Sequence, residues 1–359
     1  MIAEAEKYTY PPIQGCLPEK ILPSGCALVL EGGGTRGFYS SGVFEAFLDA
    51  GIMFPYIAGV SAGAANAVTY LSGQKLRSRQ IVEHYVGNPK YVSVRNFIFR
   101  RSMFHFDYIF HTIPQRHVAF DWETFRSCPV RFLTGAMDCA TGKTVWFEKE
   151  TITPDFSVSI ASCSVPILSP IVKFQGYELL DGGVSDPIPI EKSVADGNVF
   201  HVIVLTRNAG YSKQPFGHEK LLKALYRKHP RAAEAVLRRH EVYNRQLALC
   251  EQLEREGRAV IIRPLKPLRV KRTSADTKEL LALYDEGHAE GAAKIEEIFP
   301  RFPSRRFEQK ARGKKNGSVF AEDAPCFNQA RERPGRVRRA CRRQEHSLFP
   351  RFRLQIFHI

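Results

Sequence analysis

Two short apolar runs, each followed by small residues and then by a helical pattern, stand out near the start of the chain. Cys26–Leu30 has the length and composition of a buried parallel strand. A glycine run follows. After it, apolar residues at helical spacing predict an amphipathic helix, namely Val43, Phe44, Phe47 and Leu48, and Gly51 marks the end of that helix. A second apolar run, Tyr56–Val60, precedes a helix of small residues over Ala64–Leu71. The pattern predicts strand, glycine loop, helix, strand, sharp turn and helix, as in an α/β fold.

Weaker patterns predict the remaining elements. One helix is expected over 77–86 and another over 155–163. Apolar runs predict further strands over 130–137, 144–147, 167–174, 177–180 and 199–205. We interpret 199–205 as the last strand of the main sheet. Beyond residue 208 the pattern is mainly helical, with helices expected over 219–227, 231–256 and 275–299 and a brief strand over 259–264.

These elements divide the chain into four predicted regions. Residues 1–25 form a lead-in, residues 26–208 an α/β domain, and residues 209–300 a mainly helical region whose charged faces we expect to be solvated. Residues 301–359 lack apolar periodicity and contain 16 lysines and arginines against 5 acidic residues, a net charge of +11. We therefore expect 301–359 to be a basic, disordered tail. Because this tail carries most of the chain's formal charge of +15, that charge says little about partners of the α/β domain.

Residues 91–117 combine aromatic side chains, such as Phe99, Phe104 and Phe106, with arginines and histidines. The simplest interpretation is a packed helical insertion. The same composition is typical of an acyl-chain site that rests on an anionic lipid surface, or of a mobile lid. Single-stranded nucleic acid is bound by similar residues. Nothing else in the chain supports that alternative, and we expect no nucleic-acid partner.

The first chemical motif is Gly-x-Ser-x-Gly, formed by Gly59 to Gly63 between a predicted strand and a predicted helix. This context is typical of a nucleophile elbow. A serine on so tight a turn needs residues without side chains two positions before and two after, which Gly59 and Gly63 supply. The hydroxyl of Ser61 would then lie near a helix N-terminus, where backbone N–H groups stabilise anions. The alternative is a serine that merely caps the helix.

The second motif is a glycine loop directly after the first strand, with Gly32, Gly33, Gly34 and Gly37. Successive glycines let backbone N–H groups converge on an anion. That anion is either a phosphate, because the loop also satisfies the dinucleotide pattern G-x-G-x-x-G, or the oxyanion of an acyl intermediate. A dinucleotide site needs an acidic residue at the end of the second strand, which leads into Ser61 instead. A nucleotide site is therefore the weaker interpretation.

Three motifs in this order resemble those of the patatin-like phospholipases: the glycine loop at Gly32–Gly37, the elbow at Gly59–Gly63, and Asp-Gly-Gly at Asp181–Gly183. The stretch at 161–166, Ala-Ser-Cys-Ser-Val-Pro, also resembles that family. The resemblance covers roughly residues 26–207. It implies a three-layer α/β/α catalytic domain with a mostly parallel central sheet, followed by a small helical C-terminal appendage.

The resemblance also implies a Ser–Asp dyad. Ser61 would be the nucleophile and Asp181 the proton acceptor, with Gly182 and Gly183 leaving room for their close approach. The N–H groups of the glycine loop would hold the oxyanion. Arg36 would fix that loop, form a structural salt bridge or contact a lipid phosphate. The expected substrate is a lipid or another carboxylic ester, with peripheral membrane contact as an option, and the pattern gives no oligomeric state.

No metal or organic cofactor is expected, because the chain has no EF-hand spacing and no zinc-ligand pattern. Eight scattered cysteines without a C-x-x-C pair, no secretory signal pattern and no apolar stretch of membrane-spanning length indicate a cytoplasmic protein.

Two other functions remain open. A histidine-dependent α/β-hydrolase would place its histidine in a glycine-bounded loop after a strand, and no histidine here has that context. A non-catalytic lipid- or protein-binding module could share the fold, but it has no reason to retain both Ser61 and Asp181.

Overall fold

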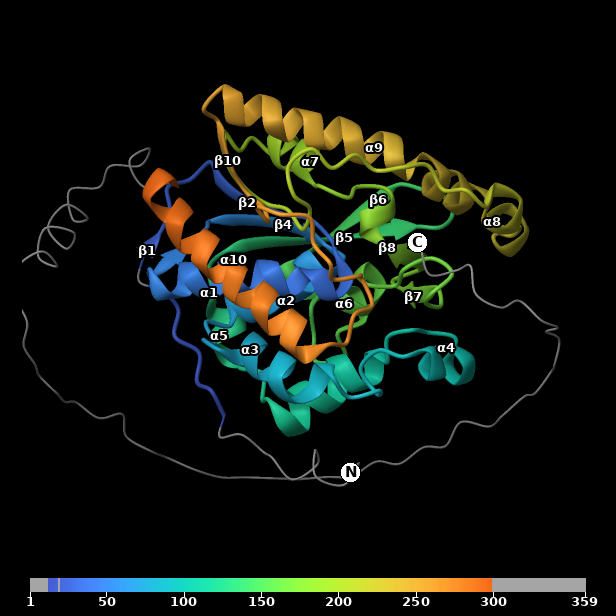
Figure 1. Cartoon of the computed structure of the whole chain (residues 1–359), viewed down its shortest axis with the longest axis horizontal. Coiled ribbons are helices and arrows are strands. Elements are labelled where there is room, and N and C mark those ends of the chain that lie inside the picture. Colours follow the sequence, from blue (N-terminus) through green and yellow to red (C-terminus); the bar gives the residue numbers. More distant parts are fainter. Residues whose placement is uncertain (1–11, 19, 299–359) are drawn as a thin grey trace, which may run out of the picture. The chain divides into compact units, whose positions relative to one another are not determined.

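The computed structural model describes residues 12–18 and 20–298 (Figure 1). Within them, an eight-stranded central sheet has the order β10–β9–β2–β4–β5–β8–β7, with β6 also paired to β5. Its parallel strands are β2 (Cys26–Leu30), β4 (Tyr56–Val60), β5 (Arg131–Asp138), β9 (Phe200–Val204) and β10 (Ala259–Ile262). Its antiparallel strands are β6 (Thr144–Glu148), β7 (Val172–Phe174) and β8 (Tyr177–Asp181). A separate short parallel pair joins β1 (Lys20–Ile21) to β3 (Ile52–Met53).

Helices cover both faces of the sheet. One face carries α1 (Phe38–Asp49), α2 (Ser61–Leu71) and α10 (Thr277–Ile298), and the other carries α7 (Ile190–Ala195) and α9 (Pro230–Arg255) (Figure 1). Side chains of β2 alternate between the two cores: Leu28 and Leu30 pack with α1, whereas Val29 packs with residues of α9. The three-layer α/β/α architecture with a mostly parallel sheet is thereby confirmed.

Shorter elements complete the fold. They are α3 (Arg77–Ile81), α4 (Val94–Arg100), α5 (Trp122–Ser127), α6 (Ser157–Ser162), α8 (Glu219–Leu225), the π-helices η2 (Val82–Val86) and η3 (Tyr108–His117), and the 3₁₀ turns η1 (Gly34–Gly37), η4 (Lys149–Thr151) and η5 (Gly182–Val184). No helix in the described ranges has the length and hydropathy needed to cross a bilayer.

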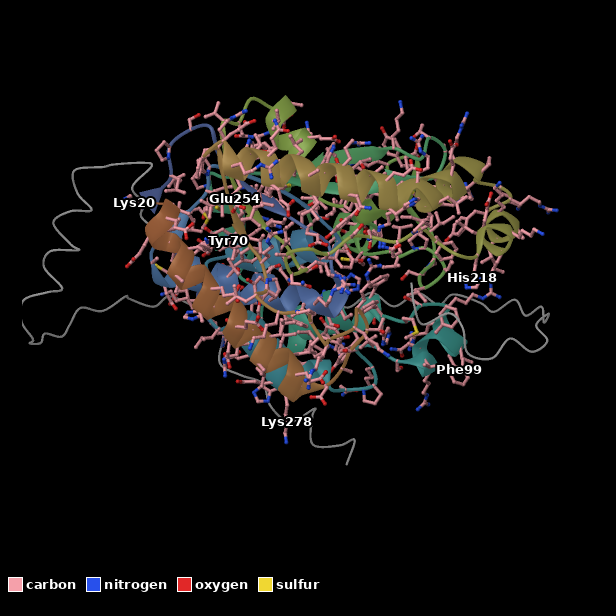
Figure 2. The ribbon with its side chains drawn as sticks, turned by 45° about the horizontal axis from the view of Figure 1, so that its top comes forward. Lys20, Tyr70, Phe99, His218, Glu254 and Lys278 are labelled. Atoms are coloured by element: carbon pink, nitrogen blue, oxygen red, sulfur yellow. The ribbon has the colours of Figure 1, made fainter. Side chains whose placement is uncertain are left out.

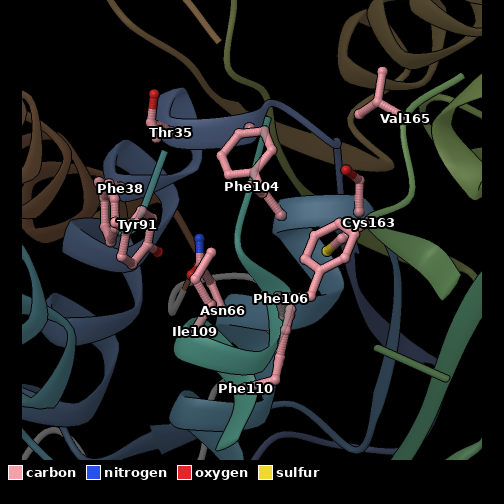
Figure 3. A pocket seen from close by; sticks show the side chains of 14 residues that line it. Thr35, Phe38, Asn66, Tyr91, Phe104, Phe106, Ile109, Phe110, Cys163 and Val165 are labelled. Carbon is pink, nitrogen blue, oxygen red and sulfur yellow. The ribbon is translucent and has the colours of Figure 1, made fainter. Parts of the chain in front are cut away.

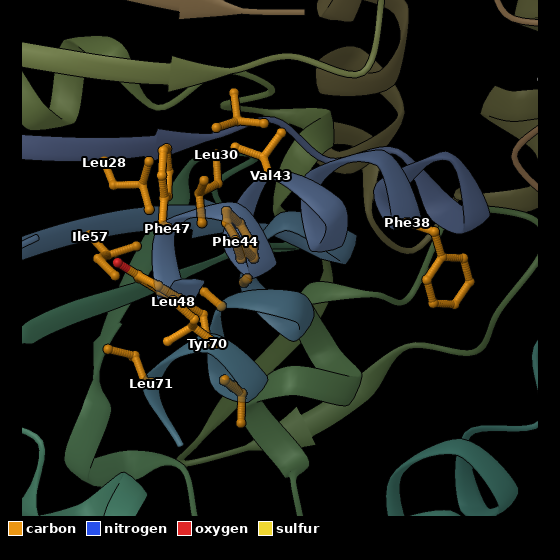
Figure 4. Close-up of a cluster of buried hydrophobic side chains, with 14 of the residues drawn as sticks. Leu28, Leu30, Phe38, Val43, Phe44, Phe47, Leu48, Ile57, Tyr70 and Leu71 are labelled. Carbon is orange, nitrogen blue, oxygen red and sulfur yellow. The ribbon is translucent and has the colours of Figure 1, made fainter. Parts of the chain in front are cut away.

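The larger core holds α2 against the sheet. Phe44 and Phe47 of α1 pack around Tyr70 of α2 (Figure 4), and the Tyr70 hydroxyl donates a hydrogen bond of 2.6 Å to Ile52 O. Tyr70 lies inside the molecule, whereas Phe99 on α4 lies at its periphery (Figure 2). Because α2 begins at Ser61, this core also fixes the position of that serine.

The region 209–300 contributes to both the sheet and the helical layer. A Cβ atom at Gly287 of α10 would overlap the backbone oxygen of Tyr39, so α10 approaches α1 as closely as two backbones allow. On the other side of the sheet, α9 leads directly into β10.

Most predicted elements are confirmed, and two expectations are wrong. Strand β9 is not the last of the main sheet, because the buried run Ala259–Ile262 pairs with it in parallel register. The strand expected over 167–174 is confined to Val172–Phe174, because Ile167 has a left-handed φ of +70° and Pro170 cannot donate a ladder hydrogen bond. The expected tail at 301–359 and the first part of the lead-in lie outside the described residues.

Candidate active site

Ser61 occupies the sharp turn between β4 and α2. Its φ of +53° lies in the left-handed region, which costs a residue other than glycine about 1–3 kcal/mol. The turn leaves no room for larger neighbours, since a Cβ atom at Gly63 would lie 2.6 Å from Glu31 O and one at Gly59 would lie 3.0 Å from Ala64 N. The strained serine is therefore held by close backbone packing on both sides.

A second buried serine, Ser162, holds this turn by hydrogen bonds. The Ser61 N–H donates to Ser162 Oγ at 2.8 Å, and the Ser162 hydroxyl donates to Gly135 O at 2.7 Å. Ser162 is fully buried at the end of α6. It was not singled out as a site residue from the sequence, although it lies in the Ala-Ser-Cys-Ser-Val-Pro stretch that resembles the patatin-like phospholipases.

Asp181 lies at the end of β8, directly beside Ser61. The Ser61 hydroxyl donates a hydrogen bond of 2.8 Å to Asp181 Oδ2, and the Gly183 N–H donates one of 2.7 Å to Oδ1. Gly182 makes this approach sterically possible, because a Cβ atom there would overlap Gly135 O. Burial raises the pKa of Asp181, while nearby Arg239 and the two hydrogen bonds act in the opposite direction. The structure thus brings Ser61, Asp181, Gly182 and Gly183 together.

The glycine loop, Gly32–Gly37, lies next to Ser61. A Cβ atom at Gly32 would lie 2.9 Å from Ser61 Cβ, and Gly34 has a left-handed φ of +58°. Asn66 on α2 donates to Gly37 O at 2.8 Å and fixes the end of the loop. The Thr35 N–H donates to Arg272 O at 2.9 Å, whereas the N–H groups of Gly33 and Gly34 donate no hydrogen bond to another described residue. Two backbone donors are therefore available close to Ser61.

Comparison with protein-family models matches residues 28–193 to the patatin-like phospholipase model. This part of the chain belongs to the patatin-like phospholipase family. A second model, a domain of unknown function (DUF6363), matches residues 229–302.

Individual relatives add little to this assignment. The uncharacterized protein YjjU of Escherichia coli (strain K12) is 25% identical over 198 residues, which are 51% of this chain and 52% of YjjU. The chain therefore spans about half the length of this curated relative. Among solved structures, VipD from Legionella pneumophila matches with 12% identity and a TM-score of 0.40, over 79% of this chain and 68% of VipD. A likeness at that level carries no argument about the patatin-like domain.

An apolar pocket of about 80 Å³ opens at Ser61 of the patatin-like domain (Figure 3). Part of its wall comes from the aromatic segment 91–117, through Tyr91, Phe104, Phe106, Ile109 and Phe110. The same segment also packs into the main core through Tyr91, Tyr108 and Phe110. The expected packed insertion is thus present, and the same segment also lines part of the pocket at Ser61.

Helix α4, within that segment, points apolar side chains outward. Ile98 is 68% exposed and Phe99 is 77% exposed, and the arginines at 95, 100 and 101 are exposed beside them. Phe99 lies at the periphery of the molecule (Figure 2). Packing of the domain core does not explain such exposure.

No histidine of the described chain is bonded to the Ser61–Asp181 pair. His201 is fully buried in β9, where its Nδ1 lies 3.1 Å from Ser193 Oγ, and burial lowers its pKa to about 4. His111 contacts Asp107 and His288 contacts Asp49, both elsewhere on the domain. Among the described residues, no group of three or more histidine, cysteine or acidic side chains is arranged to hold a metal ion.

Arg36 is only 3% exposed and lies among other cations rather than in a salt bridge. Its pKa is lowered to about 9, first by burial and then by Arg272 and Arg207, with Glu31 acting in the opposite direction. One of the three roles expected for Arg36 was a structural salt bridge, but Arg36 forms no ion pair with another described residue.

Arg239 and Arg272, which approach the dyad from the C-terminal region, were missed because charged residues of that region were expected to be solvated.

Proposed function

We propose that this protein is a serine acyl hydrolase that cleaves carboxylic esters of lipids through a Ser61–Asp181 dyad. The observation that carries the proposal is the 2.8 Å hydrogen bond from Ser61 Oγ to Asp181 Oδ2, with Ser61 held on a strained elbow. The distance lies within the range needed for direct proton transfer. The family match supports the reaction class.

In the proposed mechanism, Ser61 Oγ attacks the carbonyl carbon of the ester while its proton moves to Asp181 Oδ2. The resulting oxyanion accepts hydrogen bonds from the N–H groups of Gly33 and Gly34, next to the N-terminus of α2. Collapse of the tetrahedral intermediate breaks the ester C–O bond, and the leaving alkoxide takes the proton from Asp181. Water then attacks the acyl-enzyme, returns a proton to Ser61 through Asp181, and releases the carboxylic acid.

Burial of Asp181 favours its role as a base. Desolvation raises the pKa of the carboxyl, and a less acidic carboxylic acid has a more basic carboxylate. Arg239 opposes this effect and keeps the group ionised over a wider pH range. We therefore expect activity to increase with pH as Asp181 loses its proton.

We further propose that α4 rests on an anionic lipid surface during catalysis. Ile98 and Phe99 would insert between the lipids while the neighbouring arginines contact their headgroups. Tyr91 and Phe104, which lie on either side of α4 in the sequence, line the pocket at Ser61, so one segment would provide both the lipid contact and part of the acyl site. The free, buried thiols of Cys26, Cys139 and Cys250 suit our further proposal of a cytoplasmic location.

Hydrolysis of a short-chain chromogenic ester and of a phospholipid tests the dyad. Wild type should cleave the ester, and Ser61→Ala and Asp181→Asn should each lose at least a hundredfold in kcat. Asp186→Asn is a matched control, because Asp186 is also largely buried but bonds to Gln246 rather than to Ser61. Full activity of a folded Asp181→Asn variant would contradict the dyad. A folded wild type that cleaves no ester would favour the binding-module alternative.

A further inference from the structure

Five cationic side chains gather beside the glycine loop and the Asp181 loop, and the mechanism above uses none of them as a reacting group. They are Arg36 of the loop, Arg207 after β9, Lys213 in the following segment, Arg239 on α9, and Arg272 before α10. Four of them, Arg207, Lys213, Arg239 and Arg272, come from beyond the residues that match the patatin-like model. We call these five residues the cationic cluster.

Two members of the cationic cluster touch the catalytic loops directly. Arg239 Nε donates to Gly183 O at 2.6 Å, and its Nη2 lies 3.6 Å from the position of a Cβ atom at Gly183. Arg272 accepts the Thr35 N–H through its backbone oxygen, and its Cβ lies 3.2 Å from the position of a Cβ atom at Gly34. The cluster therefore reaches both the Asp181 loop and the loop that would hold the oxyanion.

The charges of the cationic cluster are poorly compensated. None of its five members forms an ion pair within the described residues, although other arginines do, such as Arg131 with Glu148 and Arg245 with Glu191. The carboxylates that act on the cluster are Glu31 and Asp181. Glu31 is itself engaged by the Thr206 N–H at 2.5 Å. With every group ionised, five positive charges face two negative ones.

Buried polar atoms in the cluster also lack partners. Arg36 is 3% exposed and its Nε has no hydrogen-bond partner, and the buried Nε of Arg207 has none either. Burial, and after it repulsion by neighbouring arginines, lowers the pKa of Lys213 to about 6 and that of Arg239 to about 10. Cations held together without anions are unfavourable in a protein interior, and a bound anion would relieve both the repulsion and the missing hydrogen bonds.

We propose that the cationic cluster is a binding site for a phosphate group, built largely by the C-terminal region. Several guanidinium groups around one point suit a tetrahedral oxyanion, because each offers paired N–H donors. The phosphate would come from the headgroup of a lipid whose ester lies at Ser61, or from free inorganic phosphate. Only the first source rests on the proposed function.

Calorimetric titration of the full-length protein with inorganic phosphate, at constant ionic strength, tests the site itself. Wild type should bind phosphate saturably, and Arg239→Gln and Lys213→Gln should each bind about ten- to a hundredfold more weakly. Arg239→Lys should recover part of the affinity and guards against a folding defect in Arg239→Gln. Arg238→Gln is the matched control, because Arg238 is adjacent on α9 but exposed and paired with Glu241. Equal affinity in Arg239→Gln and Arg238→Gln, or no saturable binding by wild type, would overturn the proposal.

Kinetics with a lysophospholipid and with a neutral monoacylglycerol of the same chain length distinguish the two sources. A headgroup site predicts that Lys213→Gln, which leaves the Ser61–Asp181 pair untouched, raises KM at least tenfold for the lysophospholipid and changes it little for the neutral ester. Equal effects on both esters, together with phosphate binding, assign the site to free phosphate. Phosphate binding by a protein that hydrolyses neither ester would support the site while contradicting the proposed function.

Discussion

Replacing Ser162 with alanine perturbs the elbow without touching the proposed reacting atoms. The Ser162 hydroxyl bridges the Ser61 N–H and Gly135 O, and both backbone groups are buried. Each buried polar group that loses its partner costs about 1–3 kcal/mol, so Ser162→Ala should destabilise the fold by about 2–6 kcal/mol. The turn would also lose a restraint on the left-handed φ of Ser61. We expect kcat for a short-chain ester to fall about ten- to a hundredfold with little change in KM, because a misplaced nucleophile impairs the transition state more than binding.

Ser164→Ala provides the matched control two residues away. Ser164 is as fully buried as Ser162, but its hydroxyl donates to Ile160 O, which also accepts the Cys163 N–H. Its removal therefore leaves no backbone group without a partner, and we expect a loss below about 1.5 kcal/mol and nearly normal kcat. Urea unfolding and steady-state kinetics of both variants are the assays. Equal stability and equal kcat of the two variants would refute the bridging role of Ser162.

Three further predictions follow from burial and exposure. Burial raises the pKa of Asp186 from its usual 3.8 to about 7, so the carboxyl lowers the stability of the fold progressively between these two pH values and by a constant amount above them. Asp186→Asn should therefore raise Tm at pH 8 and leave it unchanged near pH 4, and a constant difference across this range would disprove the linkage. Phe106 lines the pocket at Ser61, whose volume of about 80 Å³ is smaller than the roughly 300 Å³ typical of ligand sites. Phe106→Ala should enlarge this pocket and shift ester preference toward longer acyl chains. An unchanged chain-length profile would argue against this pocket as the acyl site. The double substitution Ile98→Ser and Phe99→Ser should reduce co-sedimentation with anionic vesicles while hydrolysis of a water-soluble ester persists, and undiminished vesicle binding would count against α4 as the lipid contact.

The local parts of this fold are predictable from sequence because their signals lie within short windows. The apolar run Cys26–Leu30 is buried whatever the rest of the chain does, and glycines on either side of Ser61 indicate a turn that larger residues cannot form. Asp181 is 120 residues from Ser61 in sequence, so only the resemblance to a known family could pair them before the structure did.

The errors arise where distant packing overrides local pattern. Ala259–Ile262 was expected to be a strand, but its place beside β9 depends on how α9 crosses the sheet. Arg239 looks like one more charged residue of a solvated helix, and its contact with Gly183 O depends on which face of α9 meets the sheet. Ile167 favours a strand by its side chain, yet it lies between two prolines in a left-handed turn.

The central claim is that Ser61 forms the acyl-enzyme with Asp181 as its base. The most direct test is to incubate the protein with a fluorophosphonate, which modifies activated serines covalently, and to locate the adduct by peptide mass spectrometry. We predict a single adduct on Ser61 in wild type, none in Ser61→Ala, and labelling at least a hundredfold slower in Asp181→Asn, with Asp186→Asn labelled at the wild-type rate. An adduct on another serine, or undiminished labelling of Ser61 in Asp181→Asn, would contradict the dyad.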